Sequence, residues 1–288
     1  MRFSFFRREE TPCPLSEEAY FCGMKYAFLG AGRMALALVH GMLRAKLCAP
    51  ADVVVSSRSR TGLENFVAAT SVRSASTNGE AVQGADVVLL CVKPPDALGV
   101  IRELGGALQG KLVISVVTGL KIAKLSEAAP GAKVIRAMPN TAAMVGRSAT
   151  AVAADASAER GDLAVAERIF SAVGGVFPVS EGQLDAVTGL SGSGPAFIYL
   201  VMEALSDGGV AAGLPRKLAL ELAVQTVLGA AEMASTTKEH PALLREMVTS
   251  PGGTTIAGLA ALETAATRSA FITAVKTAAR RSKELSGE

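Results

Sequence analysis

The chain has 288 residues, which is enough for two domains that each bury a core of their own. Half of the residues are hydrophobic, Trp is absent, and the formal net charge is only +3, with Lys and Arg scattered along the chain. This charge pattern argues against a nucleic-acid partner, and no apolar run approaches the roughly 20 residues of a membrane span, so we expect a soluble, cytoplasmic protein.

The four cysteines indicate neither a metal site nor a disulfide framework, because they lack paired spacing and high density. The one at Cys91 falls in an apolar strand pattern, which favours a buried, inert thiol. The two histidines stand far apart in the sequence, without a cluster of Cys or carboxylates around them. We therefore predict no metal. The residues concerned are Cys13, Cys22, Cys48, Cys91, His40 and His240.

Residues 1–23 form an N-terminal extension that mixes arginines with glutamates and has no long apolar centre. This composition argues against a secretory signal, and its acids argue against an organelle transit peptide. The segment is predicted to be disordered or an over-long start, with Met24 as the natural first residue. A regulatory tail is the alternative.

The turn Gly30–Ala35 follows a short apolar run, Lys25–Leu29, and precedes a helical apolar pattern. This is the strand, turn and helix context of a dinucleotide fingerprint. Gly30 makes the tight turn, Gly32 lets a pyrophosphate approach the backbone, and Ala35 takes the third small position. The fingerprint predicts cofactor contacts from Gly30, Gly32, Arg33 and Met34.

Further strand-like runs alternate with helical stretches after the fingerprint, which predicts a parallel sheet with helices on both faces. We expect a Rossmann-like α/β domain, the NADP-binding domain, over residues 24–184. The runs are Val53–Ser56, Asp86–Val92, Lys111–Val117 and Lys133–Arg136.

The end of the second strand indicates which nicotinamide cofactor the domain prefers. An acid about 20 residues beyond the fingerprint would accept the ribose hydroxyls of NAD, whereas this chain has Ser56–Arg60, with Ser57 and Arg58 at its centre. Hydroxyls and guanidinium groups suit a 2′-phosphate, so the loop favours NADPH, with NADH possible. The alternative interpretation is a solvated basic loop.

Strand signals stop after Asp185, and residues 185–288 are predicted to form an all-helical domain for substrate binding and dimerisation. A helix begins at Gly194-Pro195 and ends at Asp207-Gly208-Gly209. The next, Leu218–Met233, is apolar nearly all round, which indicates burial against a second subunit. Later helices are expected at Pro241–Val248, Thr254–Glu263 and Thr267–Leu285.

The segment Thr249–Leu259 is a glycine-rich turn carrying hydroxyls that opens onto one of these helices. A helix N-terminus has unpaired N–H groups and a partial positive charge, and adjacent glycines let a carboxylate approach the backbone. This pattern predicts an anion pocket, and a well-capped helix start is the plain alternative. The pocket would use Ser250, Gly252, Gly253, Thr254 and Thr255.

This segment closely resembles the signature of the pyrroline-5-carboxylate reductase family, and four further segments resemble that family in the expected order. They are Gly30–Ala35, Val92-Lys93-Pro94, Arg136–Thr141 and Thr188–Pro195. The resemblance begins at Met24 and covers the rest of the chain. It implies NAD(P)H-dependent reduction of the cyclic imine 1-pyrroline-5-carboxylate to L-proline, the last step of proline biosynthesis. It also implies a homodimer or a larger ring of dimers, with active sites at the dimer interface.

The resemblance also implies roles for single residues. Cofactor contacts are expected from Asn78, Val92, Lys93, Pro94 and Met138, although Pro and Asn also serve ordinary turns. Thr255 is the catalytic candidate, because its hydroxyl would hydrogen-bond the ring nitrogen as hydride arrives. Glu239 matches a position near the substrate entrance, but an exposed acid ahead of a helix is the preferred interpretation. The family usually has proline after Asn140-Thr141, where this chain has Ala142-Ala143.

Two alternatives stay open. The first is another two-domain NADP-dependent reductase acting on a different imine or a hydroxy acid, which would generally need a positioned Lys or His. The second is a non-catalytic dinucleotide-binding regulator. The intact Ser250–Thr255 segment argues against the regulator, because a sensor has no use for such a pocket.

Overall fold

The computed structural model describes residues 23–286. Eight strands in this part of the chain form one sheet, in the order β3-β2-β1-β4-β5-β6-β7-β8. Only the β6–β7 pair is antiparallel; the other neighbours are parallel. The strands are β1 Tyr26–Leu29, β2 Val53–Ser56, β3 Arg73–Ser74, β4 Val87–Leu90, β5 Leu112–Ser115, β6 Lys133–Met138, β7 Ser148–Ala154 and β8 Gly174–Pro178.

All five strands expected from the sequence are present, and the expected Rossmann-like sheet domain is confirmed. Three further strands, β3, β7 and β8, were not expected. β3 has only two residues. β7 is rich in alanine, which favours helix as much as strand, and β8 contains two glycines and a proline, which are unfavourable in strands. Intrinsic strand preferences of these residues are weak, so their pairing depends on the sheet formed by the five expected strands, β1, β2, β4, β5 and β6.

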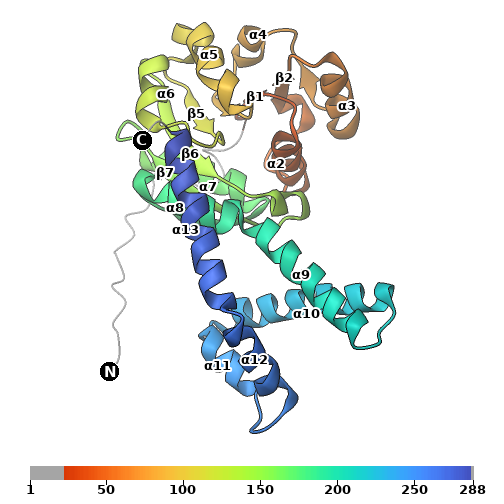
Figure 1. The fold of residues 1–288 in the computed structure, drawn as a ribbon. Helices are drawn as coiled ribbons and strands as arrows, with labels where there is room; N and C mark the ends of the chain where they lie inside the picture. The colour runs from red at the N-terminus through yellow and green to blue at the C-terminus, as the bar shows by residue number, and fades with distance from the viewer. Residues whose placement is uncertain (1–22, 287–288) are drawn as a thin grey trace.

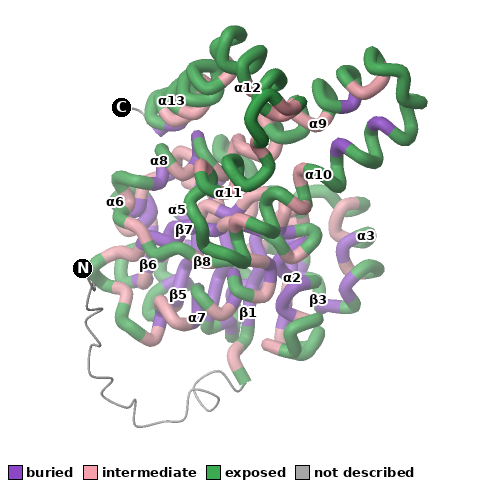
Figure 2. Tube along the Cα trace, turned by 90° about the horizontal axis from the view of Figure 1, so that it is seen from below, coloured by how far each residue is buried: buried purple, intermediate pink, exposed green. Residues whose placement is uncertain are grey.

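Helices cover both faces of the sheet, and each face has its own hydrophobic core (Figures 1 and 2). Adjacent residues of β1 point to opposite faces: Phe28 packs in one core with Leu38 and Phe170, and Leu29 packs in the other with Ile101. The first core involves α2 Arg33–Arg44, α3 Arg60–Thr70 and α7 Arg160–Ser171. The second involves α4 Asn78–Val82, α5 Pro94–Leu104 and α6 Ile122–Ala128.

From residue 184 onward the chain is helical and extends away from the sheet as an arm, until the last helix returns to it (Figure 1). The arm comprises α8 Leu184–Val187, a π-helical segment Thr188–Gly192, α9 Gly194–Ala211, α10 Arg216–Thr237, α11 Pro241–Met247, α12 Thr254–Thr264 and α13 Thr267–Leu285. Four short 3-10 turns lie elsewhere: Pro50–Asp52, Gly105–Leu108, Thr141–Val145 and Glu181–Gln183.

Helix α9 continues past Gly208-Gly209, where the sequence predicted its end. A Cβ on Gly209 would lie 3.2 Å from the Cβ of Ala219, so this glycine lets α10 approach α9 closely. The helix ends instead before Gly213, which has φ +102°. A packing glycine and a helix-ending glycine look alike in the sequence.

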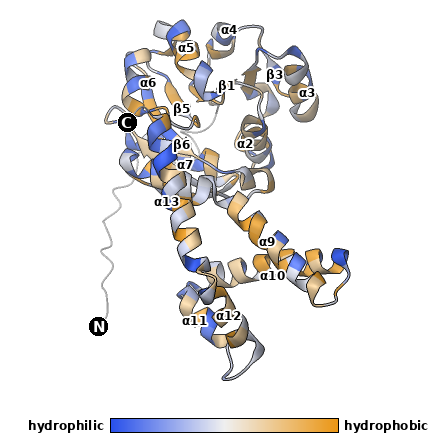
Figure 3. Ribbon diagram, viewed as in Figure 1, coloured by the Kyte–Doolittle hydropathy of each residue, from blue (hydrophilic) through white to orange (hydrophobic). Residues whose placement is uncertain are grey.

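The arm exposes a large apolar surface in the single chain (Figures 2 and 3). Leu200 on α9 is 64% exposed and Leu228 on α10 is 57% exposed, and Ala219 and Ala223 are the buried hydrophobic residues of α10. Among the described helices, α10 is long and apolar enough to cross a membrane by length and composition, with 11% of it buried. The expectation that no segment reaches this limit was therefore wrong, because α10 dilutes its few charges among many Ala and Leu residues.

We predict that Leu228→Asp weakens self-association, because an aspartate would place a charge in the apolar surface of α10. Light scattering after gel filtration should show a lower mass at a given concentration, with circular dichroism unchanged. Lys217→Asp is the matched control, because Lys217 has a side chain 92% exposed on the same helix. Equal masses for Leu228→Asp and the native protein would contradict the prediction.

Candidate nucleotide and imine-acid site

Gly30 forms the turn at the end of β1 in a conformation that other residues rarely adopt. Its φ is +107°, and a Cβ there would lie 2.7 Å from the backbone oxygen of Cys91, which follows β4. Its N–H donates to the Ser56 carbonyl at 2.9 Å, so the turn is fixed to β2 as well. The turn therefore sits where the carboxyl ends of three neighbouring strands meet.

The N-terminus of α2 faces this edge with its first N–H groups uncapped by any side chain. Gly32 is the N-cap, no side-chain cap bond is present, and the first turn carries no acid. A Cβ on Gly32 would meet only the Cys91 oxygen, at 4.0 Å, so space lies in front of the turn. Ala35 is fully buried, as the third small position requires. These features fit the pyrophosphate of a dinucleotide.

The end of β2 and the start of α4 are joined by two polar side chains. The Ser56 hydroxyl donates to Asn78 Oδ1 at 2.8 Å, and Ser56 itself is buried. Asn78 is the first residue of α4, whose N-cap Thr77 accepts from the Glu80 N–H at 3.0 Å. The expected cofactor residue Asn78 is thus held at the same strand edge as the fingerprint.

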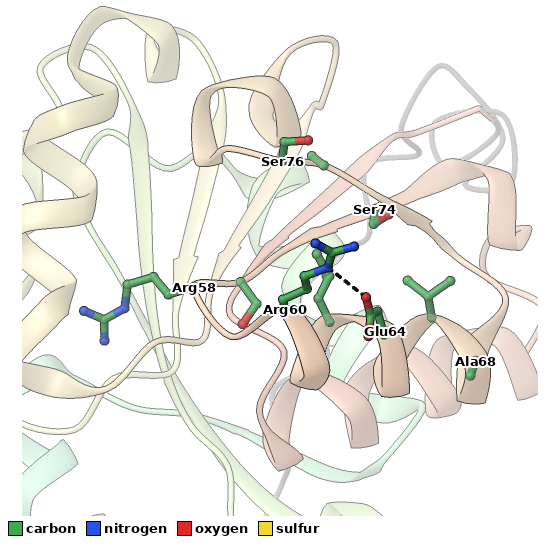
Figure 4. Close-up of a pocket in the computed structure, with 10 residues that line it drawn as sticks. Arg58, Arg60, Glu64, Ala68, Ser74 and Ser76 are labelled. Atoms are coloured by element: carbon green, nitrogen blue, oxygen red, sulfur yellow. Dashed lines mark hydrogen bonds and ion pairs between the residues drawn. The ribbon is translucent and has the colours of Figure 1, made fainter.

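Arg58 and Ser57 belong to a pocket of about 730 Å³ beside the end of β2 (Figure 4). Arg60 points toward Glu64, which it pairs with at 3.0 Å, while Arg58 extends in a different direction. The Arg58 guanidinium pairs with Asp96 of α5 at 2.5 Å, and its side chain is 80% exposed. The sequence did not single out Asp96, although its place in the first turn after Val92-Lys93-Pro94 could have indicated it.

Lys93 is the N-cap residue of α5, and Pro94 occupies the first helical position. Val92 is half-buried against the core between the sheet and α5. The segment follows β4 directly, so all three residues lie at the strand edge predicted for the cofactor. The carboxylate of Asp96, in the first turn of α5, lies beside Arg58.

Met138 and Asn140 follow at the end of β6. The Thr118 hydroxyl donates to Met138 Sδ at 3.8 Å, linking the ends of β5 and β6. Asn140 uses its amide within the protein: Oδ1 accepts from the Ala142 N–H at 3.1 Å, and Nδ2 donates to the Ser191 carbonyl at 3.0 Å. Met138 thus stays a candidate cofactor contact, whereas the Asn140 side chain is engaged elsewhere.

The hydroxyl-rich segment forms a tight turn at the start of α12. Gly252 has φ +68°, a conformation that favours glycine, and a Cβ on Gly253 would lie 2.4 Å from Ser250 Oγ, so the turn packs closely on the Ser250 side chain. The Gly253 N–H donates to the Ser250 carbonyl at 3.1 Å. Gly253 is the N-cap of α12 without a side-chain cap, which leaves the N–H groups of Thr254 and Thr255 facing outward.

The two halves of the candidate site lie far apart within one chain. In Figure 1, α11 and α12 are at the end of the molecule opposite the sheet, whereas the fingerprint is at the top of α2. Ser250, Gly252 and Thr254 are exposed and Thr255 is half-buried. The structure therefore brings the cofactor residues together at one edge and the substrate residues together in one turn, but does not join the two groups.

Glu239 lies between α10 and α11, where it is exposed. Its N–H donates to the Thr237 hydroxyl at 3.2 Å, and the next residue, His240, caps α11 by accepting from the Ala242 N–H at 3.2 Å. This is the position of an exposed acid ahead of a helix. Its role toward a substrate stays a prediction.

Burial raises the pKa of the Cys91 thiol to about 12, which agrees with an inert cysteine at the end of β4. Burial, with a smaller contribution from Asp52, raises the pKa of Cys48 to about 11. Within residues 23–286 no group of three His, Cys, Asp or Glu side chains could hold a metal ion. Cys13 and Cys22 lie outside the described residues.

The sheet, the fingerprint and the helical arm define a two-domain oxidoreductase of the nicotinamide dinucleotide class. Comparison with known sequences agrees. A model of NADP oxidoreductases, described as coenzyme F420-dependent, matches residues 25–119, and a model of the pyrroline-5-carboxylate reductase dimerisation region matches residues 181–285.

Relatives cover nearly the whole chain. The pyrroline-5-carboxylate reductase of Synechocystis is 46% identical over 91% of this chain and 98% of its own length, and that of Arabidopsis thaliana is 43% identical over 95% and 98%. The chain belongs to the pyrroline-5-carboxylate reductase family.

Solved structures agree with this assignment. The enzyme of Coxiella burnetii superposes with a TM-score of 0.87 at 38% identity, covering 92% of this chain and 99% of that one. The Plasmodium falciparum enzyme, solved with NADP bound, superposes with a TM-score of 0.83 at 31% identity, covering 91% and 98%. The expected combination of a Rossmann-like domain and a helical dimerisation domain is confirmed.

We predict that Gly30→Ala lowers the free energy of unfolding by about 1–3 kcal/mol, because the new Cβ meets the Cys91 oxygen in a strained conformation. Cofactor binding should weaken with it, and both are measured by chemical denaturation and by titration with NADPH. Gly99→Ala is the matched control, because Gly99 lies in α5 with nothing within 4 Å of an added Cβ. A variant as stable as Gly99→Ala, with native affinity, would refute the assignment.

Proposed function

We propose that the chain reduces 1-pyrroline-5-carboxylate to L-proline with NADPH, at sites assembled between two copies of the chain. The proposal rests on the presence of two features in the same chain. One is the nucleotide edge, the Gly30–Met34 segment and the strand ends beside it; the other is the uncapped, hydroxyl-rich start of α12 at Ser250–Thr255. A dinucleotide sensor would need only the first of these. An imine acid as substrate would account for the second feature, because its carboxylate would bind at the Ser250–Thr255 turn.

The cofactor would lie along the strand edge. Gly30, Gly32 and the N–H groups of Arg33 and Met34 hold the pyrophosphate, and Asn78 faces the ribose beside β2. Ser57 and Arg58 take the 2′-phosphate. Further contacts come from Val92, Lys93, Pro94 and Met138. When bound, the reduced nicotinamide supplies the hydride that adds to the carbon–nitrogen double bond.

The substrate carboxylate is bound by the turn before α12. The backbone N–H groups of Gly252 and Thr254 and the Ser250 hydroxyl would bind the carboxylate, and Gly253, whose own N–H donates to the Ser250 carbonyl at 3.1 Å, would let it approach the backbone. The dipole of α12 adds positive potential there. Because the first turn of α12 carries no acid, nothing in it opposes an anion. This turn orients the ring by its carboxylate and so fixes which carbon faces the cofactor.

Thr255 is placed one residue further into α12 and is the catalytic residue of the proposal. Its hydroxyl hydrogen-bonds the ring nitrogen, which changes from imine to amine as the double bond is reduced. The reaction needs no nucleophile on the protein, because a protonated imine is already electrophilic. A hydroxy-acid reductase would need a base, and His240, one candidate, has its Nδ1 occupied as the cap of α11.

The partner copy completes the site. The family's dimerisation region supports a homo-oligomer, and the exposed apolar surface of α9 and α10 is the surface it would cover. We infer that the Ser250–Thr255 turn of one copy reaches the Gly30–Met34 segment of the other, in a homodimer or a larger ring of dimers, and that the enzyme is cytoplasmic. Burial of α10 in the dimer explains its apolar composition without a membrane.

The division into a nucleotide-binding domain at residues 24–184 and a helical domain at 185–288 is part of this proposal. The last strand, β8, ends at Pro178, and α8 begins at Leu184, which supports a boundary between them. Residues 1–22 lie outside the described part of the chain, so the predicted extension is not addressed by the fold.

We predict that Arg58→Ala raises KM for NADPH by roughly 10- to 100-fold, because a charge-assisted hydrogen bond to phosphate is worth about 1.5–3 kcal/mol. KM for NADH should change little, since NADH lacks the 2′-phosphate. Steady-state kinetics with each cofactor measures both values, and Arg102→Ala on α5 is the control. If both cofactors lost affinity equally, the proposed phosphate contact would be wrong.

We predict that Thr255→Val lowers kcat by roughly 10- to 100-fold, as expected when one positioned polar group is lost from a reacting site. NADPH affinity should stay native, because Thr255 contacts only the substrate. The measurement is NADPH oxidation at saturating imine, with fluorescence titration of NADPH. Thr264→Val at the other end of α12 is the control, and a Thr255→Val enzyme with native kcat would remove Thr255 from the mechanism.

A further inference from the structure

Apart from the proposed ligand contacts, a short segment at the start of the helical arm packs against the strand ends of the nucleotide-binding domain. The π-helical segment Thr188–Gly192 connects α8 to α9, and its signature bond runs from the Ser193 N–H to the Thr188 carbonyl at 2.8 Å. Such segments are rare and occur frequently at functional sites. This one is clamped on two sides.

On one side it packs against α13. A Cβ on Gly189 would lie 2.5 Å from the Val275 carbonyl and 2.8 Å from the Ala279 nitrogen, so the two backbones touch. The Ser282 hydroxyl of α13 donates to Asp185 of α8 at 2.6 Å. Helix α13 therefore braces the segment from behind.

On the other side it packs against the carboxyl end of β6. A Cβ on Gly192 would lie 2.8 Å from the terminal methyl of Met138, the residue we place beside the cofactor. Asn140 Nδ2 donates to the Ser191 carbonyl at 3.0 Å. Both contacts come from the strand end at which cofactor and substrate would meet.

The Asn140 bond has a physical cause in the sequence. In a continuous helix the Ser191 carbonyl would accept from the N–H of residue 195, but that residue is Pro195, which has none. Asn140 supplies the missing donor from outside the helix. Proline at the start of α9 thus leaves a carbonyl without its helical donor, and the Asn140 amide pairs with it.

Asn140 is itself held at both its backbone and its side chain, and its carbonyl accepts from the Ala143 N–H at 3.1 Å. Its N–H donates to the buried Ser148 hydroxyl at 3.1 Å, and its Oδ1 caps the 3-10 turn Thr141–Val145 through the Ala142 N–H. The side-chain amide therefore has a fixed orientation, with Nδ2 directed at the arm. An asparagine provides the cap acceptor and the donor on two separate side-chain atoms, whereas an ionised aspartate has no donor and a serine has one oxygen for both roles.

We propose that Asn140 is a positioning residue: it fixes the start of α9, and with it the helical arm, relative to the nicotinamide end of the cofactor site. The proposal rests on the proposed function. Because α9 leads into the dimer surface, its direction sets where the partner's Ser250–Thr255 turn arrives. The bond thereby controls alignment of substrate and cofactor while leaving the nucleotide residues untouched.

The test compares Asn140→Asp with Asn140→Ala. Aspartate keeps the oxygen that caps Ala142 but replaces the donor with an acceptor facing the Ser191 carbonyl, whereas alanine removes both bonds. We expect kcat to fall by roughly tenfold or more in both variants, since small misplacements are costly. NADPH affinity should stay within about twofold of native. Both variants should lose thermal stability: alanine through the lost cap, and aspartate because its second oxygen faces the Ser191 carbonyl without a donor between them.

Asn65→Asp is the matched control, because Asn65 is exposed on α3 and the change in chemistry is the same. Hydrogen exchange of residues 188–193 is measured on the same proteins and should quicken in Asn140→Asp but not in Asn65→Asp. An Asn140→Asp enzyme with native kcat, or one with unchanged exchange, would overturn the inference. So would a loss of NADPH affinity as large as the loss of kcat, which would make Asn140 a cofactor contact.

The outcomes separate this inference from the proposed function. Failure of the native protein to reduce pyrroline-5-carboxylate would refute the function, and the exchange measurement would still decide whether Asn140 fixes the π-helical segment. If the native protein reduces pyrroline-5-carboxylate and Asn140→Asp has the same kcat and the same exchange of residues 188–193, only the role of Asn140 would be refuted.

Discussion

The rest of the structure depends on the apolar surface that the helical arm cannot bury alone. Helices α9 and α10 pack on each other through small residues such as Gly209 and Ala219, which leaves their leucines outward. Exposed apolar area of this extent is stable in water only when another surface covers it. A second copy would do so and would carry its own α11–α12 turn with it. In our account, burial of the apolar surface of α9 and α10 therefore drives oligomerisation and also completes the site.

The residues predicted to bind the nucleotide, by contrast, lie together within one chain. Gly30 can approach the Cys91 backbone because it lacks a Cβ, and this contact places the start of α2 beside the ends of β2 and β4. The arm is joined to the same edge through Asn140 and the π-helical segment. In our account the cofactor is held at the Gly30–Met34 segment, and the Asn140–Ser191 contact fixes the arm relative to it. The partner's Ser250–Thr255 turn then brings the imine acid into line with the hydride donor.

Much of this architecture could be predicted from the sequence. Buried strands such as Val53–Ser56 and the glycine turn have strong local patterns, and so do helices that begin at proline. Strands β7 and β8 could not be found, because their pairing depends on a sheet already in place. The Arg58–Asp96 and Asn140–Ser191 contacts join residues 38 and 51 positions apart, and neither is visible as a local pattern. The predicted cofactor residues and the Ser250–Thr255 turn are far apart because of the direction in which the arm leaves the sheet. No sequence motif predicts that direction.

The most direct test of a site shared between copies is complementation. Gly30→Ala chains and Thr255→Val chains, each with reduced turnover as a homo-oligomer, are co-expressed with different tags, and the mixed oligomer is purified through both. Our account predicts that turnover returns, because one site then joins an intact nucleotide edge to an intact Thr255 from the other chain. A mixed oligomer that forms but stays inactive would contradict it, since a site contained in one chain would be defective in every copy.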